Sequence, residues 1–156
     1  MNQYSLITLI ACFLSGSVMA SGNTQTSEET RPVAFLQVLD AGAAQPKPME
    51  GNRFSRKDKR QLCVVVRNVE IQENNQLIEN IKAPAKITME ANNARLIADT
   101  DGKGYQAVFE IPRTEIKNDV VVQCWEFGKQ DPVGEYHVDV QFNNVVFKNL
   151  KFEVLP

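Results

Sequence analysis

The sequence predicts an all-β fold, a β-sandwich of about seven to eight strands. Short apolar and β-prone segments recur about every ten residues, and Gly, Pro, Asn and Asp turn signals separate them. No segment of useful length shows a helical period. Many short strands in a chain of 156 residues are most readily buried as two packed sheets.

The first predicted strand, at 33–39, is apolar and β-prone (VAFLQVL). A second strand at 61–71 is almost continuously apolar, which is typical of a central strand. The segment 113–119 has room for one turn of helix. The remaining predicted strands follow in order at 76–81, 85–90, 94–99, 105–111, 119–127, 134–142 and 145–155.

Three turns are predicted from residue types that favour them. Asp101-Gly102 and Asn143-Asn144 are hairpin signals. The stretch 131–134 (DPVG) fits a type I turn, with Asp at the first position and Pro at the second. The strand after it alternates strictly, so its apolar residues face the core while His137 and its polar neighbours face away.

The N-terminal stretch 1–20 predicts a secretory signal peptide, with an apolar run and a small-residue cleavage site after Ala20. A membrane anchor is the competing interpretation, but the run is shorter than a span needs. The polar segment 21–32 is expected to be a disordered leader. We therefore expect a periplasmic or secreted protein without a stable membrane anchor.

Removal of the signal leaves Cys63 and Cys124 as the two cysteines of the exported chain. Two cysteines in an oxidising compartment most often form a disulfide, so this pairing is predicted. A crosslink that closes a loop of about 60 residues contributes roughly 4 kcal/mol to stability in the chain-entropy model. A metal-binding pair or two free thiols remain alternatives.

The closing segment GEYHVDVQFNNVVFKNLKFEV, with Gly-x-Tyr opening its first strand, resembles the last two strands of immunoglobulin-like modules in exported bacterial proteins. The resemblance covers about residues 61–156 and implies an immunoglobulin-like β-sandwich with one disulfide. An early and a late cysteine would then suit a bridge between the two sheets. The sequence departs from antibody domains because Trp125 directly follows the second cysteine.

These features divide the chain into four parts: a signal peptide at 1–20, a leader at 21–32, a first strand with a long basic loop at 33–60, and the sandwich core at 61–156. The loop is predicted at 40–60, because that stretch is rich in Gly, Pro, Ala and charge and has no apolar face. A loop of this length is either functional or disordered.

Catalytic signals are weak throughout the sequence. The single histidine, His137, is expected to be solvated, and no nucleophile elbow is present. Asp99, Asp101 and Gly102 only faintly resemble a calcium loop. We therefore expect no enzyme activity, no metal and no cofactor, and a formal net charge of −2 gives no argument for nucleic acid as a partner.

Two groups of residues are candidate partner contacts, and for each a purely structural role is the alternative. One is a basic cluster that offers a dock for an acidic partner or a solvated loop; its members are Arg53, Phe54, Arg56, Lys57, Lys59 and Arg60. The other is the aromatic pair Trp125 and Phe127 at the end of a strand. If Cys124 faces the core, alternation turns this pair outward as a contact platform. The alternative is that Trp125 packs under the loop at 40–60 or under the N-terminal strand.

The first functional hypothesis is therefore an exported binding module that acts on another envelope or secreted protein, as an inhibitor, an immunity factor or an assembly accessory. The second is a structural subunit of a surface fibre or adhesin, in which strand 33–39 would add to a neighbour's sheet. The third is a small cell-wall hydrolase that would use residues such as Glu126, Asp139 and His137.

Overall fold

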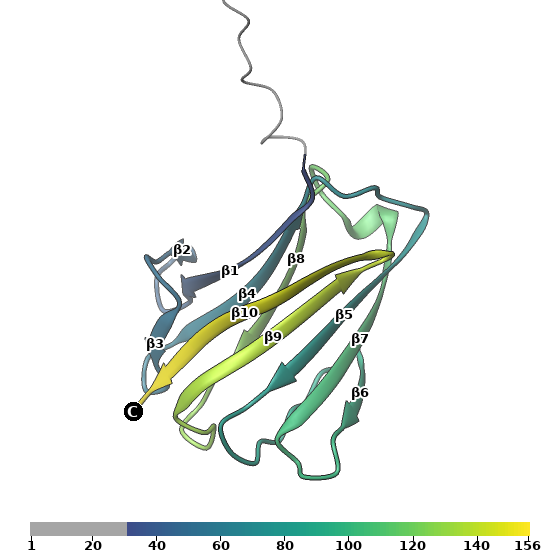
Figure 1. Cartoon of the computed structure of the whole chain (residues 1–156). Helices are drawn as coiled ribbons and strands as arrows, with labels where there is room; N and C mark the ends of the chain where they lie inside the picture. Colours follow the sequence, from purple (N-terminus) through teal and green to yellow (C-terminus); the bar gives the residue numbers. More distant parts are fainter. Residues whose placement is uncertain (1–30) are drawn as a thin grey trace, which may run out of the picture.

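The computed structural model describes residues 31–156, which form two antiparallel-dominated sheets packed face to face (Figure 1). The predicted signal peptide and nearly all of the predicted leader lie outside the described residues. Within residues 31–156 there is no helix long and apolar enough to cross a membrane. The predicted all-β sandwich is confirmed.

The smaller sheet has the strand order β2-β1-β4-β8 and the larger one the order β3-β10-β9-β5-β7-β6. Strand β3 pairs with β10 in parallel, and the other pairings are antiparallel. The bounds are β1 Val33–Asp40, β2 Lys47–Pro48, β3 Arg53–Ser55, β4 Arg60–Arg67, β5 Asn74–Lys82, β6 Arg95–Ala98, β7 Gly104–Pro112, β8 Val121–Glu126, β9 Gly134–Phe142 and β10 Val145–Leu155.

The core lies between the sheets and follows the period-two alternation of the strands. Strand β9 shows this most clearly, because Tyr136, Val138, Val140 and Phe142 are all buried in the core. His137 on the opposite face is exposed. The alternation predicted for this strand is therefore confirmed.

The predicted strand at 85–90 and the predicted long loop at 40–60 were wrong. Residues 85–90 form no strand. Strand β5, which precedes them in the chain, already pairs with β7 on one side and β9 on the other, so these residues cannot pair with β5. Residues 40–60 are not one long loop, because they contain β2 and β3. The segment 33–60 is thus part of both sheets, rather than an appendage to a core at 61–156.

The predicted disulfide between Cys63 and Cys124 is present. The bridge between sheets that the immunoglobulin resemblance implied is wrong, because the two cysteines are direct neighbours on β4 and β8 of the smaller sheet. Both lie on the side of that sheet opposite the core, since Leu62, Val64 and Trp125 occupy the alternating core positions.

The turn before β9 also lies earlier than predicted. The Asp131 amide donates to the Gly128 carbonyl at 3.0 Å, and the Asp131 carboxylate accepts from the Gly128 amide at 2.6 Å. The turn is thus closed at 128–131, and Pro132 follows it. The predicted turn of helix is present as a short 3-10 helix, Arg113–Glu115.

Candidate functional site

Trp125 faces the core, so the exposed platform expected from Trp125 and Phe127 does not form. The indole is 9% exposed, and its ring meets Phe109 of β7 edge to face at 6.0 Å between centroids. The platform required Cys124 to face inward, whereas Cys124 lies on the side of the sheet opposite the core. Strand alternation correctly places Cys124 and Trp125 on opposite faces of the sheet. It does not say which of the two faces is covered by the second sheet.

Trp125 also holds a buried carboxyl group. Its Nε1 donates to Glu79 Oε2 at 2.6 Å, while Glu79 Oε1 is buried without a hydrogen-bond partner. Glu79 lies in the middle of β5, between Ala107 on β7 and Val140 on β9. Burial raises its pKa to about 7, and the hydrogen bond from Trp125 opposes that rise.

Phe127 joins an aromatic cluster at one end of the sandwich. Its ring lies 5.4 Å from Phe54, 5.6 Å from Tyr136 and 5.3 Å from Phe152, in edge-to-face geometries. Phe54 itself is 4% exposed and belongs to the core. The cluster therefore brings Phe54 and Phe127, from the two candidate groups, into direct contact inside the molecule.

The arginines of the basic cluster are largely engaged by the protein itself. Arg53 pairs with Glu153 on the neighbouring strand at 2.7 Å, and Arg56 donates to the Asp131 carbonyl at 2.6 Å. Arg60 forms an ion pair with Asp40, which also accepts the Gly42 amide. The cluster thus ties β3 and its following turn to the rest of the sandwich.

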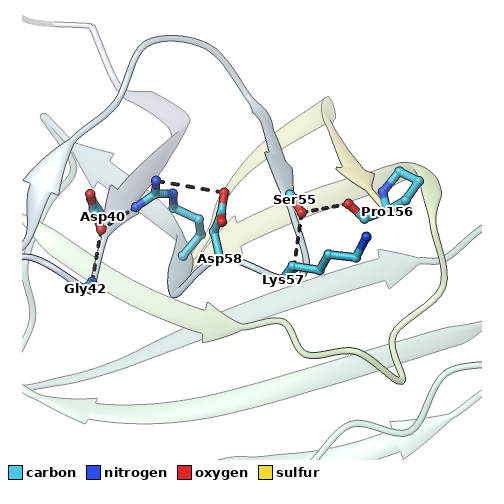
Figure 2. A network of polar contacts seen from close by, with 7 residues as sticks. Asp40, Gly42, Ser55, Lys57, Asp58 and Pro156 are labelled. Atoms are coloured by element: carbon cyan, nitrogen blue, oxygen red, sulfur yellow. Dashed lines mark hydrogen bonds and ion pairs between the residues drawn. The ribbon is translucent and has the colours of Figure 1, made fainter.

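Figure 2 shows the polar network around this turn, in which Ser55 accepts the Lys57 amide and donates to the Pro156 carbonyl. The contacts order the backbone and leave the lysine side chains outside. Lys57 and Lys59 are exposed. These two lysines remain available to a partner, as does Arg53, whose side chain is 68% exposed beside Glu153.

A hollow of about 490 Å³ opens beside Trp125 and is the candidate functional site. One wall is the irregular segment after β5, and the other is the 128–131 turn with the end of β8. Apolar side chains contribute to the lining: Ile81, Ile87, Met89, Trp125 and Phe127. Polar residues complete it: Thr88, Glu90, Glu126, Lys129, Gln130 and Asp131. An apolar lining with a few polar groups suits a side chain of a partner or a small ligand.

The other residues considered for chemistry lie apart from this hollow. His137 Nε2 lies 2.9 Å from Glu135 on the exposed face of β9, and Lys151 reaches the same carboxylate at 3.1 Å. The contacts with Lys151 first, and His137 second, hold the pKa of Glu135 below its usual value. Residues 31–156 contain no group of three or more His, Cys, Asp or Glu arranged to hold a metal.

Comparison with known proteins agrees with this architecture. A family model described as the PM0630 beta sandwich domain matches residues 34–155. The chain belongs to this family. It is also 38% identical to the uncharacterized protein PM0630 of Pasteurella multocida (strain Pm70), over 99% of each chain.

Members of the family are thus related over the whole sandwich, β1 to β10, and no activity comes with the match. The buried Glu79 is the notable residue that the sequence interpretation missed. A signal was present, because Leu77, Glu79 and Ile81 alternate along β5 and place the carboxylate on the apolar face. A polar residue at a core position is informative because it needs a partner.

Proposed function

We propose that the chain is an exported, non-enzymatic binding module that holds another protein of the bacterial envelope. The hollow beside Trp125 carries this proposal, since it combines an apolar lining with a polar rim at one end of a rigid sandwich. Loops and openings carried by a stable sheet scaffold are common places for binding. The disulfide supports export, because such bonds persist in oxidising compartments.

Glu79 and two of the three residues considered for a hydrolase lie outside the hollow, while the third, Glu126, is in its lining; this placement supports binding over catalysis. Glu79, whose pKa is raised to about 7, is fully buried behind Trp125 and has no surface to offer a substrate. His137 and Asp139 lie on the outer face of β9, away from the hollow. Strand β1 is paired with β4 over its eight residues, so the segment considered for strand exchange in a fibre is used within its own sheet.

The test is affinity capture of an envelope partner. Protein beginning at Ser21 would be crosslinked in an envelope extract of the source organism. It would be compared with an I87S/M89S variant, which removes apolar lining from the hollow, and with a K57E/K59E variant, which reverses the exposed lysines. We expect one protein to be captured by the unaltered chain and by the lysine variant, and lost from the hollow variant.

Two results would contradict the proposal in different ways. Loss of the partner from the K57E/K59E variant alone would move the contact to the basic turn and favour an acidic partner. Capture of no specific protein by any version would overturn the binding-module assignment. The free energy of unfolding of each variant, measured in urea, separates lost binding from lost folding.

A further inference from the structure

Three of the four edge strands are short or carry Lys, Arg or Pro, although β2 pairs with only Leu39 and Asp40 of β1, and β3 with only Glu153–Leu155 of β10. Strand β2 consists only of Lys47 and Pro48, β3 has three residues and begins at Arg53, and β6 has four and begins at Arg95. Short edges, charges and prolines prevent unwanted strand pairing. The fourth edge strand, β8, has six residues and contains no Lys, Arg or Pro; its one charged residue is Glu126, at its end.

The backbone of β8 offers hydrogen-bonding groups along that edge. Cys63 and Cys124 have Cα atoms 4.0 Å apart, the spacing of a non-hydrogen-bonded antiparallel pair. The next residues, Gln123 and Trp125, therefore bond to β4, while the amides and carbonyls of Val122 and Glu126 point away from it, like those of Cys124. Gln123 Nε2 donates to the Cys124 carbonyl at 3.3 Å, a contact that an incoming strand can replace.

A hollow lies at each end of this edge. Near the start of β8, residues 120–123 line a hollow of about 320 Å³ together with residues 109–111 of β7. At its other end, Trp125 and Glu126 line the hollow of about 490 Å³ beside the 87–90 segment. A strand added to β8 would run from one hollow to the other, with alternate side chains available to enter them. Pockets of this kind give strand addition its specificity, while the main-chain bonds give affinity.

The charges around the two hollows indicate the chemistry of the strand. Glu90 and Glu126 line one hollow, and Glu110 and Glu115 line the other; all four are exposed. Among the described residues that line either hollow, Lys129 is the one cation. Glu126 accepts from the neutral amide of Gln61, and Glu110 from that of Gln76. A partner with cationic flanks complements this rim.

We propose that the β8 edge receives an extended segment of the partner as an added strand. The segment has apolar side chains at alternate positions and Lys or Arg at its flanks. This inference rests on the proposed function, because it names how the partner reaches the hollow beside Trp125. The exposed side chain of Val122, 53% accessible, would lie beside the added strand.

The test uses the synthetic peptide Lys-Lys-Thr-Val-Thr-Leu-Thr-Val-Lys-Lys and two controls, one with alternate backbone amides methylated and one with Glu in place of Lys. NMR of the full exported chain would follow the amide protons of Val122, Cys124 and Glu126. We expect the peptide to slow their exchange with solvent. We expect each control to bind at least about tenfold more weakly, since the first loses main-chain hydrogen bonds and the second loses charge complementarity.

A pair of matched variants tests the place of binding. V122K puts a charge on the β8 edge, whereas V146K puts one on β10 of the other sheet, at a valine that is 52% exposed and lies outside the stretch paired with β3. We expect V122K to weaken peptide binding at least about tenfold and V146K to leave it unchanged.

Equal binding of the methylated peptide, equal effects of the two variants, or no binding of any peptide would overturn strand addition. A dimer in sedimentation that V122K breaks would assign the edge to a second copy and overturn the partner segment. None of these results depends on envelope capture. The binding module can therefore survive the loss of this mechanism, and peptide binding without envelope capture would overturn the module alone.

Discussion

Residues 53–60 and residues 121–131 are both conspicuous in the sequence, one for its charge and one for its aromatic side chains, but the fold uses them differently. In the basic segment Phe54 is in the core and Arg60 is paired with the partly buried Asp40, while Arg53 has a carboxylate partner, Glu153, at the surface. The second segment ends in a turn that walls a hollow and begins with an open strand edge. A cluster of charges in the sequence therefore does not indicate free charge, because neighbouring strands supply counterions that lie far away in the chain.

The largest expected effect concerns Phe54, which was predicted as a contact residue and is packed in the core. Phe54→Ala removes a buried ring that touches Phe127 and Phe152, so the free energy of unfolding should fall by about 3–5 kcal/mol. Urea denaturation measures this loss. Lys57→Ala in the same segment is the control, and we expect it to change stability by less than about 0.5 kcal/mol. Equal losses of stability in the two variants would contradict the assignment of Phe54 to the core and Lys57 to the surface.

The sequence is sufficient to predict most strands, because each strand's own residues alternate between apolar and polar side chains. It also predicts that Cys124 and Trp125 lie on opposite faces. Which of those faces is inward depends on the position of the second sheet, so the sequence leaves both directions of Trp125 open, and the structure turns it inward. The hollow could not be predicted at all, because its two walls are brought together only by the packing of the sheets.

The segment 85–90 illustrates the same limit. Ile87 and Met89 are alternate apolar residues, which is a valid local signal for a strand. A strand also needs a neighbour with free hydrogen-bonding groups, and here only the Ile87 amide bond to the Gly102 carbonyl, 3.0 Å, ties the segment to the next turn. The apolar side chains then become part of the lining of the hollow.

The second prediction concerns the pH dependence that Glu79 gives to the 121–131 region. Its folded-state pKa is raised from 4.5 to about 7, so the folded protein holds the proton more tightly than the unfolded chain. The resulting stability is fully present below about pH 4.5 and is lost as the pH rises through about 7. The loss amounts to about 3 kcal/mol.

Urea denaturation across this pH range measures the effect, and the single tryptophan reports the titration because Trp125 bonds to the titrating carboxyl group. Glu79→Gln is the matched control, since it cannot ionise and should flatten the dependence between pH 4.5 and 7. A Glu79→Gln profile as steep as that of the unaltered chain would assign the dependence to other groups.

The third prediction separates the packing of Trp125 from its hydrogen bond. Trp125→Phe keeps an aromatic ring beside Phe109 but removes the donor to Glu79 Oε2, so neither carboxyl oxygen then has a hydrogen-bond partner. We expect a loss of about 1–3 kcal/mol at pH 8, where the carboxyl group is ionised. The bond lowers the pKa of Glu79 in the unaltered chain, so the pKa should rise further in the variant, as carboxyl NMR would measure. An unchanged pKa would show that the bond does not stabilise the ionised form.

The smallest expected effect returns to the basic segment and compares two adjacent cations. Arg60 pairs with Asp40 across β1 and β4, and both side chains are at least two-thirds buried. Lys59 beside it is exposed. Arg60→Ala should cost about 1 kcal/mol, while Lys59→Ala should cost less than about 0.5 kcal/mol. Because the Asp40 pair is partly shielded from solvent, the cost of Arg60→Ala should remain largely intact when urea denaturation is repeated at high salt. If the two substitutions had equal effects, Arg60 would be only another solvated charge, open to a partner like Lys57 and Lys59.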